Sequence, residues 1–269
     1  MEDSAIVGII GVGNIGNALV RGWIEHGPAT TSVVVFDRDG PRAAKVATEA
    51  GSRVGHAGTL KELVHVADPL IVATKPQDMD TLMAELAPLL RPGQKVVSTA
   101  AGVTLARLRA SVGSGPILLR MMPNMAVGVG QGVVALAGEE GAGPSALEAV
   151  SGLLEGLGTI GVLPEEYFDV VTAVTGSGPG FLAVVLEGLE DGAVRAGLPR
   201  HVARPFVRQM ALGTSRLLLD DAGPAGVLKD QVSSPGGTTM AGLAVLEDRS
   251  VRGAMIRAVE AAVERGRQL

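Results

Sequence analysis

The chain has 269 residues, of which 46% are hydrophobic and 19% charged, and its net charge is −5 at pH 7. This length suits two domains, and a mild negative charge without a basic run argues against nucleic acid as a partner. There is no cysteine and the four histidines form no ligand-spaced pair, so disulfides, thiolate catalysis and a metal site are not expected.

The first residues do not have the pattern of a targeting signal. Met1–Ser4 is acidic, and the apolar run that follows, Ala5–Ile10, is short. Nowhere do about 18 apolar residues follow one another without interruption, as a membrane-spanning helix requires. We therefore expect a cytoplasmic protein with no membrane partner.

The first half of the chain alternates between strand-like and helix-like patterns. Apolar and β-branched runs predict strands over residues 5–10, 32–36, 69–74, 95–99, 117–121 and 132–136. Apolar residues at helical spacing predict helices over residues 16–26, 41–50 and 79–90. This alternation predicts an α/β fold with a doubly wound parallel sheet, which we assign to residues 1–162.

After Val162 the patterns become helical. Turn clusters separate four long helical stretches, Glu165–Val174, Pro179–Ala196, His201–Leu219 and Thr238–Gly266. We therefore predict a second, all-α domain over residues 163–269.

A glycine-rich loop joins the first predicted strand to the first predicted helix. Gly11, Gly13 and Gly16 have the GxGxxG spacing, in which the first glycine makes a tight turn, the second admits a pyrophosphate and the third packs helix against strand. Asp37 closes the second predicted strand, where a ribose-binding carboxylate belongs. Together these features predict a Rossmann-like dinucleotide site.

The residues after the second strand bear on the choice of cofactor. A carboxylate at Asp37 accepts a hydrogen bond from the free 2′-hydroxyl of NADH and repels the 2′-phosphate of NADPH. Arg38 beside it either pairs with that phosphate or lies in solvent. The sequence therefore favours NADH and leaves NADPH open.

A second candidate site lies in the helical half. Residues 233–239 read SSPGGTT and precede a predicted helix. Hydroxyls, two glycines and a helix N-terminus make a concavity that suits an anion such as a substrate carboxylate. The alternative is an ordinary helix cap, in which Ser or Thr satisfies backbone N–H groups.

These motifs resemble those of the pyrroline-5-carboxylate reductases. Residues 229–247, KDQVSSPGGTTMAGLAVLE, are very close to the family's signature, and GVGNIG, ATKP, AAGVT, RMMPN, GSGP and AGLPR precede it in the family's order. The resemblance implies NAD(P)H-dependent reduction of 1-pyrroline-5-carboxylate to L-proline in proline biosynthesis. It also implies a homodimer with interlocked helical domains, the active site at that interface, and larger rings of dimers.

The resemblance further implies roles for individual residues. In addition to Asp37 and Arg38, the cofactor would be held by Gly11, Val12, Gly13, Asn14, Ile15, Ala73, Lys75, Pro76, Ala100, Ala101, Gly102 and Asn124. The imino acid would be bound by Ser234, Gly236, Gly237, Thr238 and Thr239. Thr239 would be the catalytic residue, with its hydroxyl beside the ring nitrogen. Hydride transfer to a protonated C=N bond needs chiefly orientation and a hydrogen-bonding partner for nitrogen, so a hydroxyl is enough.

Three positions depart from the family's pattern. Met125-Ala126 stands where the family has Thr-Pro, Gly180-Phe181 where it has Ala-Tyr, and Leu60 where an Asn often contacts the cofactor. These changes leave open a related imine reductase that acts on a substituted pyrroline or a piperideine carboxylate.

Two other classes of protein share part of the pattern. Hydroxyacid dehydrogenases of similar architecture depend on a lysine in a helix after a glycine-rich turn, and the helix after Gly176–Pro179 contains none. A non-catalytic nucleotide-sensing protein has no need of the SSPGGTT segment. Both are therefore less favoured than a reductase.

Overall fold

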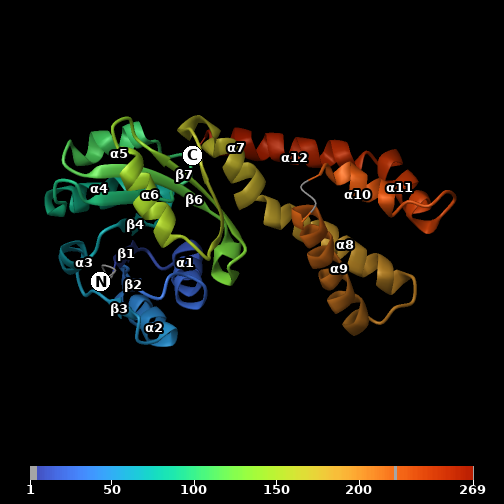
Figure 1. The fold of residues 1–269 in the computed structure, drawn as a ribbon, viewed down its shortest axis with the longest axis horizontal. Coiled ribbons are helices and arrows are strands. Elements are labelled where there is room, and N and C mark those ends of the chain that lie inside the picture. The colour runs from blue at the N-terminus through green and yellow to red at the C-terminus, as the bar shows by residue number, and fades with distance from the viewer. Residues whose placement is uncertain (1–4, 221–222, 269) are drawn as a thin grey trace. The chain divides into compact units, whose positions relative to one another are not determined.

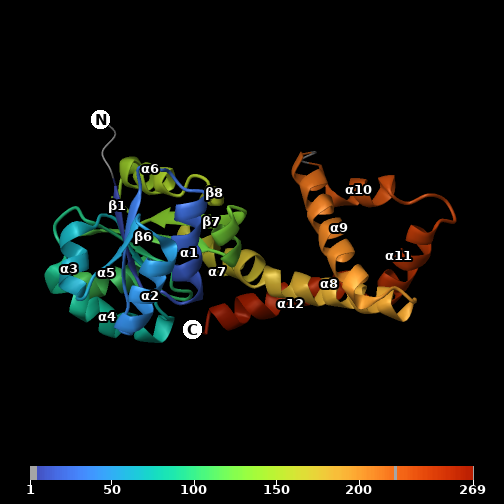
Figure 2. The same cartoon turned by 90° about the horizontal axis from the view of Figure 1, so that it is seen from below.

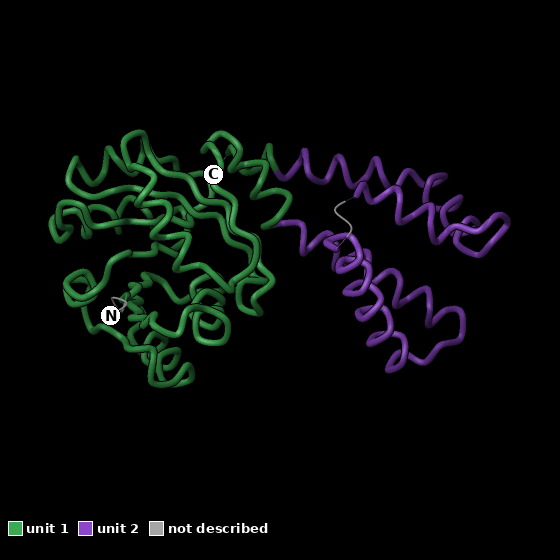
Figure 3. The backbone as a smooth tube through the Cα atoms, in the orientation of Figure 1, with its two compact units in different colours: residues 1–176, 263–269 green, residues 177–262 purple. Residues whose placement is uncertain are grey.

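The computed structural model describes residues 5–220 and 223–268. The chain forms two compact units, one of residues Met1–Gly176 and Val263–Leu269 and the other of Ser177–Ala262 (Figure 3). The predicted boundary at residues 162 and 163 lies earlier than this division. Phe168 is fully buried against Met122 and Ala137, and this packing places residues 163–176 in the first unit.

One eight-stranded sheet forms the first unit (Figure 1). Its strands are β1 (Ile6–Ile10), β2 (Ser32–Phe36), β3 (Val54–His56), β4 (Leu70–Val72), β5 (Lys95–Ser98), β6 (Ile117–Pro123), β7 (Gly132–Gly138) and β8 (Gly158–Val162). They lie in the order β3-β2-β1-β4-β5-β6-β7-β8. The α/β fold with a Rossmann-like sheet is thereby confirmed.

One pair of strands differs from the predicted parallel arrangement. β6 and β7 are antiparallel, whereas every other neighbouring pair is parallel. Only the short 3₁₀ helix η3 (Met125–Val129) and a few flanking residues join β6 to β7. A connection of this length is too short for the crossover that parallel strands need.

The helices follow the sequence patterns in part. They are α1 (Asn14–Glu25), α2 (Gly40–Ala50), α3 (Leu60–Val66), α4 (Met79–Leu86), α5 (Leu105–Val112), α6 (Pro144–Leu153), α7 (Phe168–Val171), α8 (Gly178–Arg195), α9 (Arg200–Asp220), α10 (Ala225–Gln231), α11 (Thr238–Asp248) and α12 (Val251–Gly266). Short turns supplement them, namely η1 (Pro76–Asp78), η2 (Ala87–Leu89), η4 (Glu165–Tyr167) and the π-helical turn η5 (Thr172–Gly176).

The prediction of one helix over Thr238–Gly266 is wrong. The chain leaves the helix at Arg249 and turns at Ser250, whose φ is 53°, before α12 begins. A non-glycine residue in the left-handed region ends an α-helix, because the helical hydrogen-bond ladder cannot pass through it.

Two hydrophobic clusters cover the two faces of the sheet. Val7 and Ile9 of β1 pack with Leu19 and Trp23 on the side of α1, α2 and α6. The opposite face packs against α3, α4 and α5 (Figure 2). The central strands β1, β4, β5 and β6 are therefore buried on both faces, as their continuous apolar runs predicted, whereas the edge strands β3 and β8 are largely exposed.

The second unit has almost no core of its own. Among its described residues only Glu190 and Ala203 are buried. Large apolar side chains instead face outward, with Val184 68% and Phe206 67% exposed. An apolar surface of this extent marks an interaction site.

The helical stretch Glu165–Arg195 is also apolar. It spans 31 residues and contains an 18-residue window with a mean hydropathy of 1.5, so by length and composition alone it is a candidate membrane span. The expectation of no membrane partner rests on the sequence and stays a prediction.

Candidate active site

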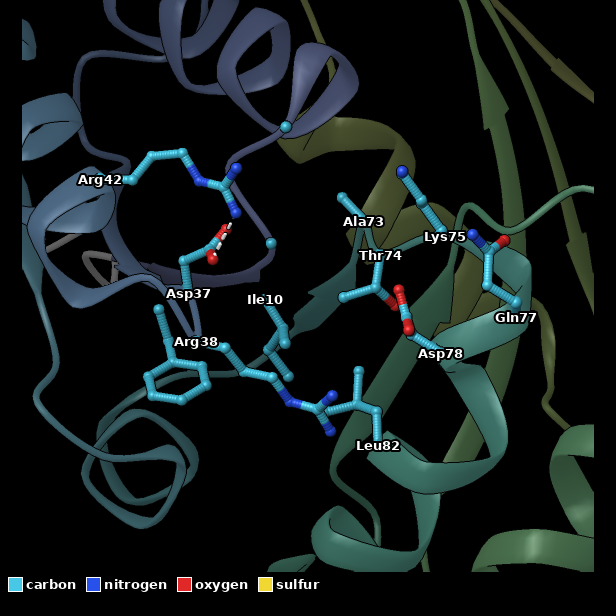
Figure 4. A pocket seen from close by; sticks show the side chains of 13 residues that line it. Ile10, Asp37, Arg38, Arg42, Ala73, Thr74, Lys75, Gln77, Asp78 and Leu82 are labelled. Atoms are coloured by element: carbon cyan, nitrogen blue, oxygen red, sulfur yellow. Dashed lines mark hydrogen bonds and ion pairs between the residues drawn. The ribbon is translucent and has the colours of Figure 1, made fainter.

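A pocket of about 520 Å³ opens at the carboxyl ends of β1, β2 and β4 (Figure 4). The strand order reverses here, since β2 lies on one side of β1 and β4 on the other. Ligands of doubly wound sheets bind at such a switch point. The lining residues are Ile10, Gly11, Gly13, Phe36, Asp37, Arg38, Arg42, Ala73, Thr74, Lys75, Gln77, Asp78 and Leu82.

The three glycines of the loop each meet a different steric demand. Gly11 has a φ of +97°, and a Cβ there would stand 2.8 Å from the carbonyl oxygen of Ala73. A Cβ at Gly16 would stand 2.0 Å from the carbonyl oxygen of Gly11. Nothing lies within 4 Å of the Cβ position at Gly13, which lines the pocket at the N-terminus of α1. The open space at Gly13 fits a pyrophosphate that approaches the backbone and the positive end of the helix.

Asp37 is buried at the edge of this pocket. Its Oδ2 accepts a hydrogen bond from the Val12 N–H at 2.9 Å, and its Oδ1 accepts one from the Asp39 N–H at 2.9 Å. The Arg42 guanidinium donates to Oδ1 at 2.6 Å. Burial raises the pKa of Asp37, but the hydrogen bonds from Arg42, Val12 and Asp39 together outweigh it and lower the pKa below its ordinary value of 3.8. Asp37 is therefore ionised, and it ties the glycine loop to the start of α2.

Arg38 turns away from Asp37. It donates to the Glu85 carboxylate at 3.2 Å and runs beside Leu82 in Figure 4. On the side of the pocket opposite Asp37, the lining residues are Lys75, which precedes η1, and Gln77 and Asp78, which belong to it. Thr74 lines the pocket as well, and its Oγ1 is buried without a hydrogen-bond partner among the described residues.

The structure brings together part of the predicted cofactor set. Gly11, Gly13, Asp37, Arg38, Ala73 and Lys75 line one pocket, and Val12, Asn14 and Ile15 continue the same loop and helix. Pro76 begins η1 beside Lys75. Ala100, Ala101 and Gly102 follow β5 and are not among the lining residues.

Asn124 is engaged within the fold. Its Oδ1 accepts a hydrogen bond from the Val133 N–H at 3.2 Å, and its Nδ2 donates to the carbonyl oxygen of Thr175 at 3.1 Å. A contact between this side chain and a cofactor therefore stays a prediction.

Arg120, from the RMMPN motif, is buried in β6. It donates to Oε1 of Glu165 at 2.7 Å and lies 4.8 Å from the centre of the Phe168 ring. The same carboxylate oxygen accepts the Leu105 N–H at the start of α5. These contacts fix η4 against the sheet, so Arg120 has a structural role.

The predicted substrate residues lie together in the second unit. Residues 234–237 form a tight turn, with a φ of +69° at Gly236 and a hydrogen bond from the Gly237 N–H to the Ser234 carbonyl at 3.0 Å. A Cβ at Gly237 would stand 2.3 Å from the Ser234 hydroxyl oxygen. Gly237 is the N-cap of α11, and no side chain caps this helix. The ordinary Ser or Thr cap, the alternative left open by the sequence, is therefore absent at this helix.

Thr238 and Thr239 form the first turn of α11. Thr238 is exposed and Thr239 half-buried. Their assignment to substrate binding stays a prediction.

The sequence did not predict several residues that line the pocket, among them Arg42, Thr74, Gln77, Asp78 and Leu82. Two of them had a usable signal: Arg42 follows Asp37 closely in the first turn of a helix, and Thr74 stands in the ATKP motif. The pairing of Arg42 depends on how the chain turns between β2 and α2. Among residues 5–220 and 223–268, no cluster of three or more His, Asp or Glu residues has an arrangement that could hold a metal ion.

The glycine loop, the switch-point pocket and the buried carboxylate define a dinucleotide-dependent oxidoreductase. Comparison with known families agrees. A family model described as NADP oxidoreductase, coenzyme F420-dependent, matches residues 6–102, and one described as pyrroline-5-carboxylate reductase dimerisation matches residues 165–269.

Individual relatives match over the full length. A pyrroline-5-carboxylate reductase of Synechocystis is 37% identical, with 98% of this chain and 97% of that protein covered. One of Methanosarcina acetivorans is 34% identical, with 100% and 99% covered. The crystal structure of 1-pyrroline-5-carboxylate reductase from Streptococcus pyogenes superposes with a TM-score of 0.88 at 28% identity and covers 100% of both chains. The chain belongs to the pyrroline-5-carboxylate reductase family, whose members are NAD(P)H-dependent oxidoreductases that act on a C=N bond.

Proposed function

We propose that this chain reduces 1-pyrroline-5-carboxylate to L-proline with NAD(P)H. The observation that carries the proposal is the full-length similarity to reductases of that name, which spans the dinucleotide site and the SSPGGTT segment alike. In this proposal residues 1–162 bind the cofactor, and residues 163–269 bind the imino acid and dimerise.

The protein's own part in the reaction is orientation. The turn at Ser234–Gly237 and the uncapped N–H groups of α11 receive the substrate carboxylate. Thr239 then lies beside the ring nitrogen, where its hydroxyl oxygen accepts a hydrogen bond from the iminium N–H. A bound nicotinamide cofactor supplies the hydride, which adds to C5 while the proton stays on nitrogen.

The exposed apolar surface of the second unit supports assembly. The match to a dimerisation family model over residues 165–269 indicates homo-oligomerisation through the helical domain. We propose a homodimer, because a second copy of the same surface covers side chains such as Val184 and Phe206 at a self-complementary interface. The same burial accounts for the apolar stretch Glu165–Arg195 without a membrane, and we propose a cytoplasmic location.

A panel of cyclic imino acids tests the substrate. NADPH and NADH oxidation is followed at 340 nm with 1-pyrroline-5-carboxylate, its hydroxylated analogue and the six-membered piperideine carboxylates. We expect the highest kcat/KM for 1-pyrroline-5-carboxylate. A much faster analogue would assign the chain to a related imine reduction, to which the changes at Met125-Ala126 and Phe181 would then be tied.

A further inference from the structure

The ribose corner of the cofactor pocket holds an arginine that the glycine-loop motif does not include. Arg42 stands in the first turn of α2, and its guanidinium donates to Oδ1 of Asp37 at 2.6 Å (Figure 4). Asp37 directly follows β2, at the position where the carboxylate of such folds meets the ribose 2′-oxygen. Arg42 therefore lies where the two nicotinamide cofactors differ.

Arg38 and Arg42 both line the pocket, but they have different partners. Arg38 is bonded to Glu85 of α4 at 3.2 Å, so its guanidinium is directed toward α4. Arg42 is bonded to Asp37 itself. The side chain of Arg42 is 51% exposed and that of Asp37 only 7%, so the guanidinium forms the accessible side of the pair.

The pair changes what Asp37 offers to a nucleotide. A lone carboxylate accepts the 2′-hydroxyl of NADH and repels the 2′-phosphate of NADPH. Here Oδ1 already accepts Arg42 and the Asp39 N–H, and Oδ2 accepts the Val12 N–H. The negative charge is neutralised by a partner with further N–H donors in a planar fork, a geometry that matches phosphate.

We propose that Arg42 is the residue that sets cofactor choice, by donating to the 2′-phosphate of NADPH while it neutralises Asp37. This inference rests on the proposed NAD(P)H dependence and adds a preference for NADPH. Asp37 alone favours NADH, as the sequence predicted, whereas the pair that it forms with Arg42 favours NADPH. Hydrogen bonds to Asp37 also hold its pKa down, so the carboxylate remains a charged anchor for Arg42 when NADPH binds.

Calorimetric titration with two nucleotides that differ only in the 2′-phosphate tests the role directly. Adenosine 2′,5′-bisphosphate and AMP are titrated into the full-length protein without imino acid. The variants are Arg42→Ala and Arg42→Gln, the second of which keeps an amide donor for Asp37 but carries no charge. Lys45→Ala is the matched control, because Lys45 lies on the same helix, is 73% exposed and does not line the pocket.

We expect the wild type to bind the bisphosphate at least about 10-fold more tightly than AMP, in line with a charge-assisted contact worth about 1.5–3 kcal/mol. Both Arg42 variants should lose most of this preference for the bisphosphate, while their affinity for AMP stays within about 3-fold of the wild-type value. Lys45→Ala should keep the wild-type preference. An Arg42→Gln protein that retains the wild-type ratio overturns the proposal. Since no imino acid is present, the ratio of the two affinities does not depend on the reductase assay. If the wild type reduces 1-pyrroline-5-carboxylate but the Arg42 variants keep its affinity ratio, the result refutes this inference and leaves the proposed function standing.

Discussion

Asn124 and Thr175 join the sheet to the π-helical turn η5, which ends the longer segment of the first unit. The Asn124 amide donates to the Thr175 carbonyl at 3.1 Å, and its oxygen accepts the Val133 N–H, so one buried side chain holds β6, β7 and η5 together. π-helical turns often occur at functional sites. We therefore interpret Asn124 as a positioning residue.

Substitution of Asn124 tests this interpretation. Asn124→Ala leaves the Val133 N–H and the Thr175 carbonyl without partners, and we expect the free energy of unfolding to fall by about 1–3 kcal/mol in urea denaturation. Gln131→Ala, an exposed amide in the same loop, should change it by less than about 0.5 kcal/mol. Unchanged stability with a raised KM for the cofactor would instead favour the direct contact that the motif suggests.

Gly13 should be needed for binding rather than for folding. No atom lies within 4 Å of the Cβ position, so Gly13→Ala should leave Tm within about 2 °C of the wild type. The methyl group would occupy the space of the pyrophosphate, and we expect the Kd for NADPH, measured by fluorescence quenching, to rise at least about 10-fold. Gly40→Ala, also in open space but outside the pocket, is the control. Equal affinities for all three proteins would place the pyrophosphate elsewhere.

The hydrogen bonds that Asp37 accepts from Val12, Asp39 and Arg42 should make the Tm of the protein depend on pH in the acid range. The pKa of Asp37 is lower in the folded protein than its ordinary value of 3.8, so ionised Asp37 stabilises the fold above that pH. This contribution is lost as pH falls through the folded pKa. Asp37→Asn should therefore lower Tm at pH 7 and show a shallower fall of Tm between about pH 5 and pH 2.

Asp80→Asn is a matched control for the acid effect. Asp80 also pairs with an arginine, Arg107, but its side chain is 65% exposed and solvent screens the pair. We expect its Tm profile to follow the wild type. An Asp37→Asn profile that runs parallel to the wild type at all pH values would show that Asp37 does not anchor the loop as an anion.

Substitution of Thr239 should slow turnover of the imino acid without changing the affinity for the cofactor. If its hydroxyl bonds the ring nitrogen, Thr239→Ala should lower kcat/KM for the imino acid by about 10²-fold, as loss of one positioned polar group does. Thr239→Ser keeps the hydroxyl and should recover most of the activity. NADPH affinity should stay the same in both. Wild-type kinetics in Thr239→Ala would remove this residue from the mechanism.

The protein should form a dimer or larger assembly through the exposed apolar surface of its helical domain. Light scattering after size-exclusion chromatography should give the wild type a mass of at least twice 27.3 kDa. Phe206→Glu places a charge on the exposed apolar surface and should shift the mass toward that of one chain. Thr48→Glu, at an exposed position of α2 in the first unit, should leave the mass unchanged. A monomeric wild type would contradict the proposed dimer.

Several features could be predicted from sequence because local chemistry determines them. β2 has the predicted bounds, Ser32–Phe36, and the glycine loop meets the steric demands that its spacing indicates. The antiparallel direction of β7 could not be predicted from the sequence, because the apolar pattern of a strand is the same in either direction. The direction depends on the connection that joins the strand to its neighbour. The Asp37–Arg42 pair likewise depends on the turn into α2, where Asp39 accepts the Arg42 N–H and so orients the first turn of that helix.

Transfer of deuterium from labelled cofactor tests the central claim most directly. The protein is incubated with 1-pyrroline-5-carboxylate and NADPH that carries deuterium on the transferred C4 position of the nicotinamide, and the product is analysed by mass spectrometry and NMR. We predict L-proline with one deuterium, located at C5, because the hydride adds to the carbon of the C=N bond. Cofactor oxidation that gives no proline, or proline without deuterium at C5, would contradict the account.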